Sequence, residues 1–182
     1  MGILFLIGPR GCGKSLAMDR LVRERGCRGC DTDRLIVEAE GKSVAGIVAE
    51  DGWAAFRAAE KRALGEAVRR MGAAGAAPGV VATGGGIVLD PENRALMRRS
   101  GVAVYLAAPV EALVSRLQNA RERNARPPLS GLSFEEEIRA VFIEREAFYR
   151  ETARYSVDAS KPPEAVADAL YGILLRHCKE TL

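Results

Sequence analysis

The sequence predicts an α/β fold built on a parallel sheet. Short apolar runs rich in β-branched residues at 3–7, 80–83 and 102–106 are each followed by Gly or Pro and then by a helical pattern. This alternation is typical of βαβ units, whose strands lie parallel. A glycine-rich loop with a lysine, GPRGCGKS at 8–15, directly follows the first run. The loop fits the same fold, because loops of this kind join a strand to a helix.

The other elements follow in order along the chain. Two weaker strand candidates lie at 27–30 and 155–158. Helical patterns, several of them opened by a proline that a first turn tolerates, are predicted at 14–25, 52–71, 91–100, 109–120, 134–152 and 162–178. The segment at 119–133 is polar, arginine-rich and broken by a Pro-Pro pair, which predicts a mobile surface loop.

Composition is that of a globular protein. The 182 residues, 48% of them hydrophobic, are enough for one domain with a sizeable core. The formal net charge is only +3 and the arginines are spread along the chain, so no nucleic-acid partner is expected. The first apolar run is too short for a signal peptide or a membrane span. We therefore expect a cytoplasmic protein, with no membrane partner, whose four cysteines are reduced.

The glycine-rich loop predicts a binding site for a nucleoside triphosphate. Gly8, Gly13, Lys14 and Ser15 have the spacing of the phosphate-binding loop, in which backbone N–H groups and a helix N-terminus converge on phosphate oxygens. Lys14 supplies a charge for the β- and γ-phosphates, and the Ser15 hydroxyl is placed to bind Mg²⁺. The strand-loop-helix context disfavours the alternative, a turn with a solvated lysine. The expected ATP-binding residues of the loop are Gly11, Cys12, Gly13, Lys14, Ser15 and Leu16.

Two carboxylates follow the second candidate strand. Asp31 and Asp33 stand at its carboxyl end, where a parallel sheet binds ligands, and strand alternation would place both on one side. One could hold a water of the Mg²⁺ shell, while the other accepts a hydrogen bond from an attacking hydroxyl. The alternative, an Asp-Thr-Asp helix cap, applies to one of them in any case.

Three consecutive glycines, Gly84, Gly85 and Gly86, follow the third strand. They indicate either that backbone amides approach a ligand closely or that the turn needs positive φ. The residue pattern favours neither alternative.

Two arginines raise a choice between anion binding and an ordinary surface position. Arg57 lies on the apolar edge of a helix with Glu60 at i+3, which could hold the guanidinium for a substrate carboxylate. An exposed ion pair is the alternative, and the pattern alone slightly favours it. Arg145, with Tyr149 one turn later, is either a second anion clamp or a solvated helix arginine.

The chain resembles the shikimate kinases, in particular the type with the longer lid. The resemblance rests on GPRGCGKS, DTDR, FRAAE, TGGG, ARPPL and REAFY, which stand in the family's order. It implies ATP-dependent phosphorylation of the 3-hydroxyl of shikimate, on the route to chorismate and the aromatic amino acids. It also implies a three-layer P-loop kinase fold similar to nucleoside monophosphate kinases, in which helices flank a five-stranded parallel sheet. One domain at 1–182 would contain a shikimate-binding helical region at about 32–62 and a mobile lid at about 119–133.

The resemblance implies a role for each acceptor residue. Asp33, Arg57, Arg145 and the turn of Gly84, Gly85 and Gly86 would bind shikimate, with both arginines facing its carboxylate. Asp33 would hydrogen-bond the reacting hydroxyl and could serve as the base. The expected small-molecule partners are therefore ATP and shikimate, bound by a monomer or a weak dimer.

The resemblance assigns the charge and metal roles as well. Lys14 and the lid residue Arg126, which would also contact ATP, would stabilise charge on the transferring phosphoryl group. Ser15 and, through water, Asp31 would hold the cofactor Mg²⁺. Catalysis by positioning and charge neutralisation suits the loose transition state of phosphoryl transfer.

Three function classes fit the residues. The first is a shikimate kinase, the second a kinase of the same fold for gluconate or a nucleotide, and the third a nucleotide-dependent switch protein without transfer activity. The pair Arg57 and Arg145 favours a carboxylate acceptor, and Asp33 with Arg126 favours a kinase over a switch. Cys27 and Cys30 also match a redox or zinc half-site, but their spacing to other metal-binding residues is arbitrary, and no metal is expected there.

Overall fold

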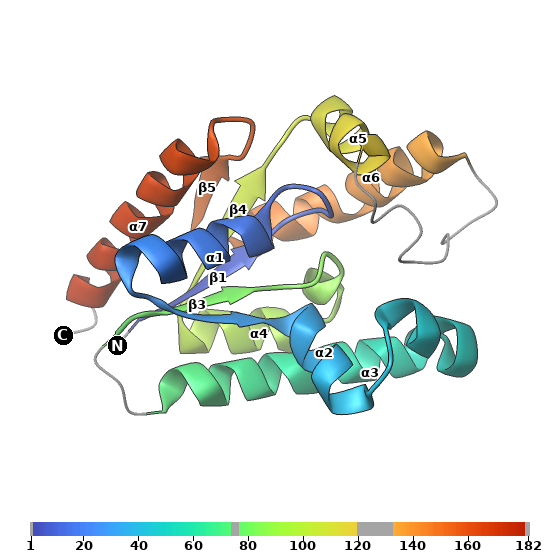
Figure 1. Ribbon diagram of the computed structural model, residues 1–182, viewed down its shortest axis with the longest axis horizontal. Helices are drawn as coiled ribbons and strands as arrows, with labels where there is room; N and C mark the ends of the chain where they lie inside the picture. The colour runs from blue at the N-terminus through green and yellow to red at the C-terminus, as the bar shows by residue number, and fades with distance from the viewer. Residues whose placement is uncertain (1, 74–76, 120–132, 181–182) are drawn as a thin grey trace.

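The computed structural model describes residues 2–73, 77–119 and 133–180 (Figure 1). Within them, parallel strands form a 5-stranded sheet in the order β2-β3-β1-β4-β5. The strands are β1 Ile3–Ile7, β2 Arg28–Asp31, β3 Gly79–Ala82, β4 Val102–Ala107 and β5 Tyr155–Asp158. The chain builds outward from β1 in both directions, so the carboxyl end of β1 is the point at which such sheets bind ligands.

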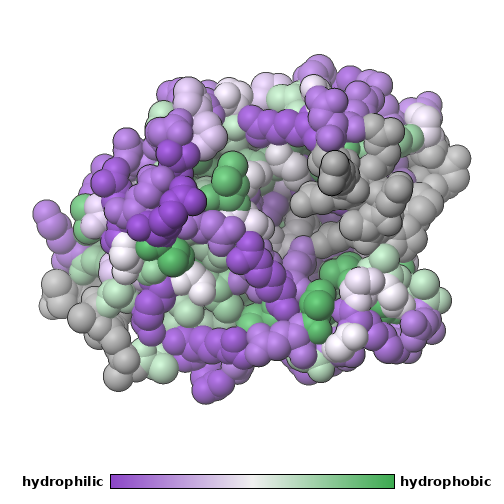
Figure 2. Space-filling view, viewed as in Figure 1, coloured by the Kyte–Doolittle hydropathy of each residue, from purple (hydrophilic) through white to green (hydrophobic). Residues whose placement is uncertain are grey.

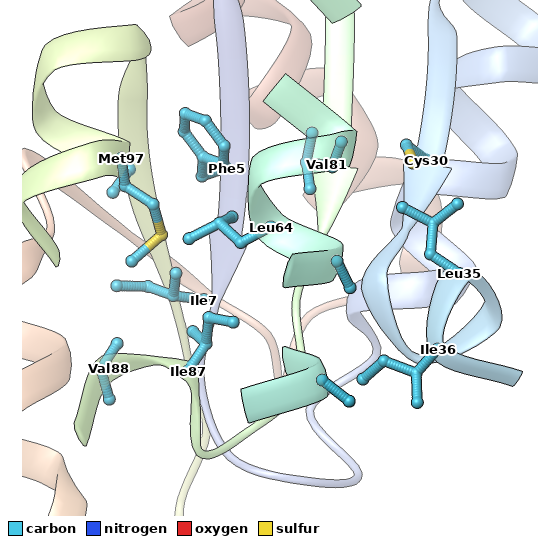
Figure 3. Packing of buried hydrophobic residues seen from close by; sticks show 14 of the residues in the cluster. Phe5, Ile7, Cys30, Leu35, Ile36, Leu64, Val81, Ile87, Val88 and Met97 are labelled. Carbon is cyan, nitrogen blue, oxygen red and sulfur yellow. The ribbon is translucent and has the colours of Figure 1, made fainter. Parts of the chain in front are cut away.

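Helices cover both faces of the sheet and complete three layers (Figure 1). They are α1 Lys14–Arg25, α2 Thr32–Glu40, α3 Val44–Gly72, the 3-10 turn η1 Ile87–Leu89, α4 Pro91–Ser100, α5 Val110–Asn119, α6 Phe134–Thr152 and α7 Pro163–Glu180. Side chains of β1 alternate between two cores. Leu4 and Leu6 pack with α1, α5 and α7. Phe5 and Ile7 pack with α3, α4 and α6 on the other face (Figure 3).

The predicted parallel sheet is confirmed, and so are the helices at 14–25, 91–100 and 134–152. The helical pattern did not predict α2, which the sequence indicated only through a possible Asp-Thr-Asp helix cap and, by the resemblance, a helical region at about 32–62. The helix predicted to start at residue 52 corresponds to the second, longer part of α3. Gly52 has φ 81° and ψ 173°, so it separates a short helix at 44–51 from a longer one at 53–72.

Arg28 on β2 binds the C-terminal end of α3. Its guanidinium donates to the carbonyl oxygens of Met71 at 2.5 Å, Ala73 at 3.1 Å and Arg70 at 3.3 Å, and its Nε donates to Ala77 at 3.2 Å. The last carbonyls of a helix have no intrahelical partner, and a cation there also complements the helix dipole. Arg28 therefore fastens the end of the long helix to the edge strand of the sheet.

Replacing Arg28 with alanine is expected to lower the free energy of unfolding by about 2 kcal/mol, because several charged hydrogen bonds are lost. For a chain of this size, that corresponds to a fall in Tm of about 4–8 °C. Thermal unfolding followed by circular dichroism measures it. Arg69→Ala is the matched control, since Arg69 is exposed at the same helix end and pairs only with Glu66 among the described residues. Equal Tm values for the two variants would contradict the assignment.

The face of the molecule shown in Figure 2 is largely hydrophilic. On the face shown in Figure 2, hydrophobic residues appear only in small groups. The exposed large hydrophobic residues are Leu16, Val22, Val37, Ile143 and Leu175. A search of the described helices finds none long and apolar enough to cross a membrane.

Candidate active site

The glycine-rich loop leaves β1 at the carboxyl edge of the sheet and leads directly into α1. Gly8, Gly11 and Gly13 have φ values of 144°, 81° and 94°, a backbone region that favours glycine. Gly13 caps α1 without any side-chain hydrogen bond. Among the described residues no side chain caps this helix at Gly13, and a helix N-terminus without such a cap suits a bound anion.

Lys14 is buried against the backbone of this loop. Its Nζ donates to the carbonyl oxygens of Gly8 and Pro9, both at 2.8 Å, and lies 3.6 Å from Cys12 Sγ. The predicted positive charge is therefore present inside the loop, where it also holds the loop's shape.

Asp31 caps α2, which is one of the alternatives for the Asp-Thr-Asp sequence, and its second carboxylate oxygen faces Ser15. Its Oδ1 accepts hydrogen bonds from the N–H groups of Asp33 at 2.9 Å and Arg34 at 3.2 Å, which caps α2. Its Oδ2 accepts a 2.6 Å hydrogen bond from Ser15 Oγ. A hydroxyl and a carboxylate oxygen side by side are the hard ligands that Mg²⁺ prefers, so the donor set fits that ion.

Asp33 also lies at the carboxyl edge of the sheet, but for a different reason than the one predicted. The strand-alternation argument is wrong, because β2 ends at Asp31 and Asp33 lies in the first turn of α2. An ideal Cβ placed on Gly84 would lie 3.0 Å from Asp33 Oδ1 and 2.5 Å from Glu60 Oε1. Both carboxylates therefore border the first glycine of the turn after β3.

The glycines after β3, called here the triglycine turn (Gly84, Gly85 and Gly86), are needed for close packing. None of them has positive φ, so that alternative is wrong. A Cβ on Gly86 would collide with the guanidinium of Arg57, as one on Gly84 would with Glu60. At Gly85 a Cβ would meet only backbone atoms at ordinary contact distances. Charged side chains therefore approach the main chain at two of the three positions.

Arg57 forms an ion pair with a buried carboxylate. Its Nη1 donates to Glu60 Oε2 at 2.5 Å, and the side chain of Glu60 is only 2% exposed, against 30% for Arg57. The guanidinium carbon also lies 5.3 Å and 5.7 Å from the ring centres of Phe56 and Trp53. The alternative of an ordinary exposed pair is wrong, and the arginine is held in place before any ligand arrives.

Arg57 and Arg145 line one cavity, together with Trp53, Gly85 and Gly86. The Arg145 side chain is 10% exposed, and its Nε is buried without a hydrogen-bond partner in the part of the chain that is described. The carboxylate of Glu144 lies 3.5 Å from that nitrogen. Two guanidinium groups therefore line a space beside the triglycine turn.

Tyr149, one turn after Arg145, bonds directly to the turn. Its hydroxyl donates to the Gly85 carbonyl oxygen at 2.5 Å, and its ring stacks on Tyr105 with centroids 5.3 Å apart. Burial raises the pKa of both phenols, that of Tyr105 to about 12. The Tyr149 hydroxyl therefore stays protonated and acts as a donor.

A second cleft lies beside the phosphate-binding loop. It is lined by Gly11, Cys12, Leu16, Arg116, Ala159, Lys161 and Pro163, among others. Arg116 donates to the carbonyl oxygens of Ala159 at 2.8 Å and Gly11 at 3.4 Å, which joins the loop before α7 to the phosphate-binding loop. Sequence reasoning missed Arg116, because a single arginine on a helix carries no local signal. It also missed Thr32, whose Oγ1 accepts a 2.9 Å hydrogen bond from the Gly84 N–H.

Most of the predicted site residues converge on the carboxyl edge of the sheet. They are Gly11, Cys12, Gly13, Lys14, Ser15, Leu16, Asp31, Asp33, Arg57, Gly84, Gly85, Gly86 and Arg145. Arg126 and all of the predicted lid except its two end residues lie outside the described residues. The described cysteines are free, and burial raises the pKa of the Cys27 and Cys30 thiols. No cluster of three or more His, Cys, Asp or Glu residues suited to a metal occurs in the ranges described.

Comparison with known proteins points to one family. A sequence profile described as "Shikimate kinase" matches residues 10–174. "Shikimate kinase 2" of Salmonella paratyphi B is 47% identical over 172 residues, which cover 94% of this chain and 91% of that protein. A solved structure titled "Shikimate kinase from Acinetobacter baumannii in complex with shikimate" superposes with a TM-score of 0.83 at 30% identity, over 100% of this chain and 96% of the other. Shikimate kinase from Bacteroides thetaiotaomicron gives 0.81 at 28% identity, over 95% and 98%.

Proposed function

The chain belongs to the shikimate kinase family, and from that premise we propose how its residues share the work of the reaction. It is a kinase that transfers a phosphoryl group from ATP to the 3-hydroxyl of shikimate, a step toward chorismate and the aromatic amino acids. The proposal concerns the roles of the individual residues. The observation that carries it is the pair of cavity-facing guanidinium groups, one of them held by a buried carboxylate.

Arg57 and Arg145 bind the carboxylate of shikimate. A guanidinium presents two parallel N–H donors to a carboxylate, and one that is already fixed loses little freedom on binding. Glu60 and the two aromatic rings supply that fixation for Arg57, and burial supplies it for Arg145. The triglycine turn, which lines the same cavity, binds shikimate through its backbone.

Asp33 accepts the proton of the attacking hydroxyl. Its carboxylate borders Gly84, so it lies next to the turn that binds the acceptor and on the same sheet edge as the phosphate-binding loop. As the oxygen of the 3-hydroxyl bonds to the γ-phosphorus, its proton passes to Asp33, while the bond to the ADP oxygen breaks.

Lys14 and Arg126 neutralise charge on the transferring phosphoryl group. Lys14 is already within the loop, whose N–H groups would bind the other phosphate oxygens. Ser15 directly, and Asp31 through water, would hold Mg²⁺, which supplies charge neutralisation on the phosphates. Arg126 belongs to the proposed lid at 119–133, whose closure would exclude water from the site.

The cleft beside Arg116 receives the adenine ring. It adjoins the phosphate-binding loop through Gly11 and is walled by Pro163, and the planar guanidinium of Arg116 offers a face for stacking. The chain forms a single domain at 1–182, with its shikimate-binding region at about 32–62. It acts as a monomer in the cytoplasm. Size-exclusion chromatography with light scattering tests the oligomeric state.

The acceptor site makes a direct prediction for tryptophan fluorescence. Trp53, the one tryptophan in the chain, lies beside Arg57, so shikimate added without ATP should change its fluorescence saturably. Arg57→Ala should weaken this binding by about 2 kcal/mol or more, which is roughly 30-fold in Kd, and leave ATP binding nearly unchanged. Calorimetry measures both affinities.

The matched control is Arg62→Ala. Arg62 lies on the same helix, is exposed and pairs with Glu40 at 2.8 Å. It should bind shikimate like the unchanged protein. A coupled assay of ADP release with shikimate, gluconate or nucleoside monophosphates tests the function itself, and only shikimate should support turnover. Unchanged fluorescence together with no heat of binding, or turnover with another acceptor, would contradict the proposal.

A further inference from the structure

We propose that Thr32 and Tyr149 are positioning residues, whose hydroxyl groups lock the peptide planes of the triglycine turn so that it presents only N–H donors to shikimate. The inference deepens the proposed function and rests on it, since it assumes that this turn binds the acceptor. Neither hydroxyl is proposed to contact shikimate. Each acts through the main chain.

The carbonyl groups of the turn are already occupied. The Gly84 oxygen accepts a hydrogen bond from the Ile87 N–H at 3.2 Å, and the Gly86 oxygen accepts one from the Leu89 N–H at 3.0 Å. Both bonds belong to the short 3-10 segment η1 that follows the turn. The carbonyl of Gly85 has no partner in η1 and depends on another element.

Tyr149 on α6 provides the hydrogen-bond donor for the Gly85 carbonyl, and Thr32 on α2 bonds to the first residue of the turn. The Tyr149 hydroxyl donates to the Gly85 oxygen at 2.5 Å, and Thr32 Oγ1 accepts from the Gly84 N–H at 2.9 Å. Within the described ranges, the N–H groups of Gly85 and Gly86 donate to no protein group. Each carbonyl of the turn therefore already accepts a hydrogen bond, while the N–H groups of Gly85 and Gly86 have no described acceptor, which suits a ligand rich in hydroxyl and carboxylate oxygens.

The geometry of the peptide bond explains why the Tyr149 hydroxyl matters. The Gly85 carbonyl and the Gly86 N–H belong to one trans peptide, so they point in opposite directions. Bonding the carbonyl to Tyr149 directs the N–H away from Tyr149. Glycine on both sides would otherwise let this peptide rotate at little cost, which would replace a donor by a carbonyl that repels carboxylate and hydroxyl oxygens.

Thr32 fixes the turn relative to the reacting groups. Its side chain is fully buried, and it lies in the chain between Asp31, which bonds to Ser15, and Asp33, the proposed base. Tyr149 is likewise buried, and it lies one helical turn from Arg145. Thr32 thus connects the triglycine turn to the segment that carries the proposed base Asp33. Tyr149 connects the same turn to the helix that carries Arg145, which binds the carboxylate of shikimate.

The test removes each hydroxyl and preserves the shape of the side chain. Thr32→Val and Tyr149→Phe should each raise the KM and Kd for shikimate about tenfold, because a bond that orients the turn is lost. The KM for ATP should stay within twofold, and kcat should fall less than the affinity. Thr32→Ser keeps the hydroxyl and should restore shikimate affinity to within about twofold, which a requirement for the methyl group alone would not permit.

Thr152→Val is the matched control. The Thr152 hydroxyl is buried on the same helix as Tyr149 but donates to the Phe148 carbonyl at 2.7 Å, away from the turn. If Thr32→Val and Tyr149→Phe bind shikimate no more weakly than Thr152→Val, the inference is wrong and the proposed function stands. If the unchanged protein itself fails to bind shikimate in calorimetry, the proposed function fails instead. A variant that loses ATP and shikimate affinity equally, with a lowered Tm, would show a merely structural role and would also overturn the inference.

Discussion

Replacing Lys14 with alanine is expected to lower kcat by about 10³-fold, a loss of the size that follows removal of a fixed charge at a phosphoryl or oxyanion site. The ammonium lies inside the phosphate-binding loop, where it bonds to the carbonyl oxygens of Gly8 and Pro9. Without it, the negative charge that develops on the γ-phosphate loses a fixed cation of the loop, which the backbone N–H groups, Arg126 and Mg²⁺ of the proposed site do not replace. The coupled assay of ADP release at saturating ATP and shikimate measures the effect.

A structural loss must be separated from the catalytic one. Lys14→Ala also leaves two loop carbonyls without their donor, so a thermal unfolding curve is recorded for the same preparation. Lys61→Ala is the control, since Lys61 is exposed and pairs with Glu92 at 2.6 Å on the surface. We expect it to keep full turnover. Turnover by Lys14→Ala at the level of the unchanged enzyme would refute the assignment of the loop.

Asp33→Asn is expected to lower kcat by about 10²- to 10⁴-fold, the range for loss of a general base. Asparagine keeps the size of the side chain and can still hydrogen-bond a hydroxyl, but it cannot take up a proton at neutral pH. The KM for shikimate should therefore change much less than kcat, because the arginines that bind the carboxylate are untouched. Steady-state kinetics with shikimate as the varied substrate separates the two parameters.

Asp19→Asn provides the comparison for Asp33→Asn. Asp19 is a carboxylate on α1 that pairs with Arg34 on α2 at 2.9 Å, close in sequence to the site but exposed. It should leave kcat and KM unchanged. If Asp33→Asn instead raises KM and retains kcat, Asp33 binds the acceptor in its ground state and does not act as the base.

The sequence was sufficient where a short pattern determines the structure. The phosphate-binding loop could be predicted from its glycines, because Gly8, Gly11 and Gly13 adopt backbone angles that other residues disfavour. The strands could be predicted from apolar runs because a parallel sheet is buried on both faces. The position of Asp31 could be predicted as well, although its double role as cap and as partner of Ser15 required the structure.

Features created by contacts between distant segments could not be predicted. Glu60 looked like half of a surface ion pair, but it is buried because the triglycine turn, which comes later in the chain, packs against it. Thr32 and Arg116 were not predicted as site residues, since their roles come from hydrogen bonds across the fold, one at Thr32 and two at Arg116. The short helix at 44–51 was missed for a related reason: the predicted helix began at residue 52, and the sequence does not reveal that Gly52, with its positive φ, joins two helices.

The triglycine turn also bears on how this enzyme could become resistant to an inhibitor. A compound that takes its affinity from the N–H groups of Gly85 and Gly86 binds main-chain atoms, and substitutions other than proline retain those donors. Adding a side chain at Gly86 would displace Arg57, and adding one at Gly84 would displace Glu60, so either escape would damage the acceptor site. Gly85 is the position of the turn where a Cβ meets only ordinary contacts. Resistance substitutions within the turn are therefore expected first at Gly85. Sequencing resistant clones selected with such an inhibitor tests this.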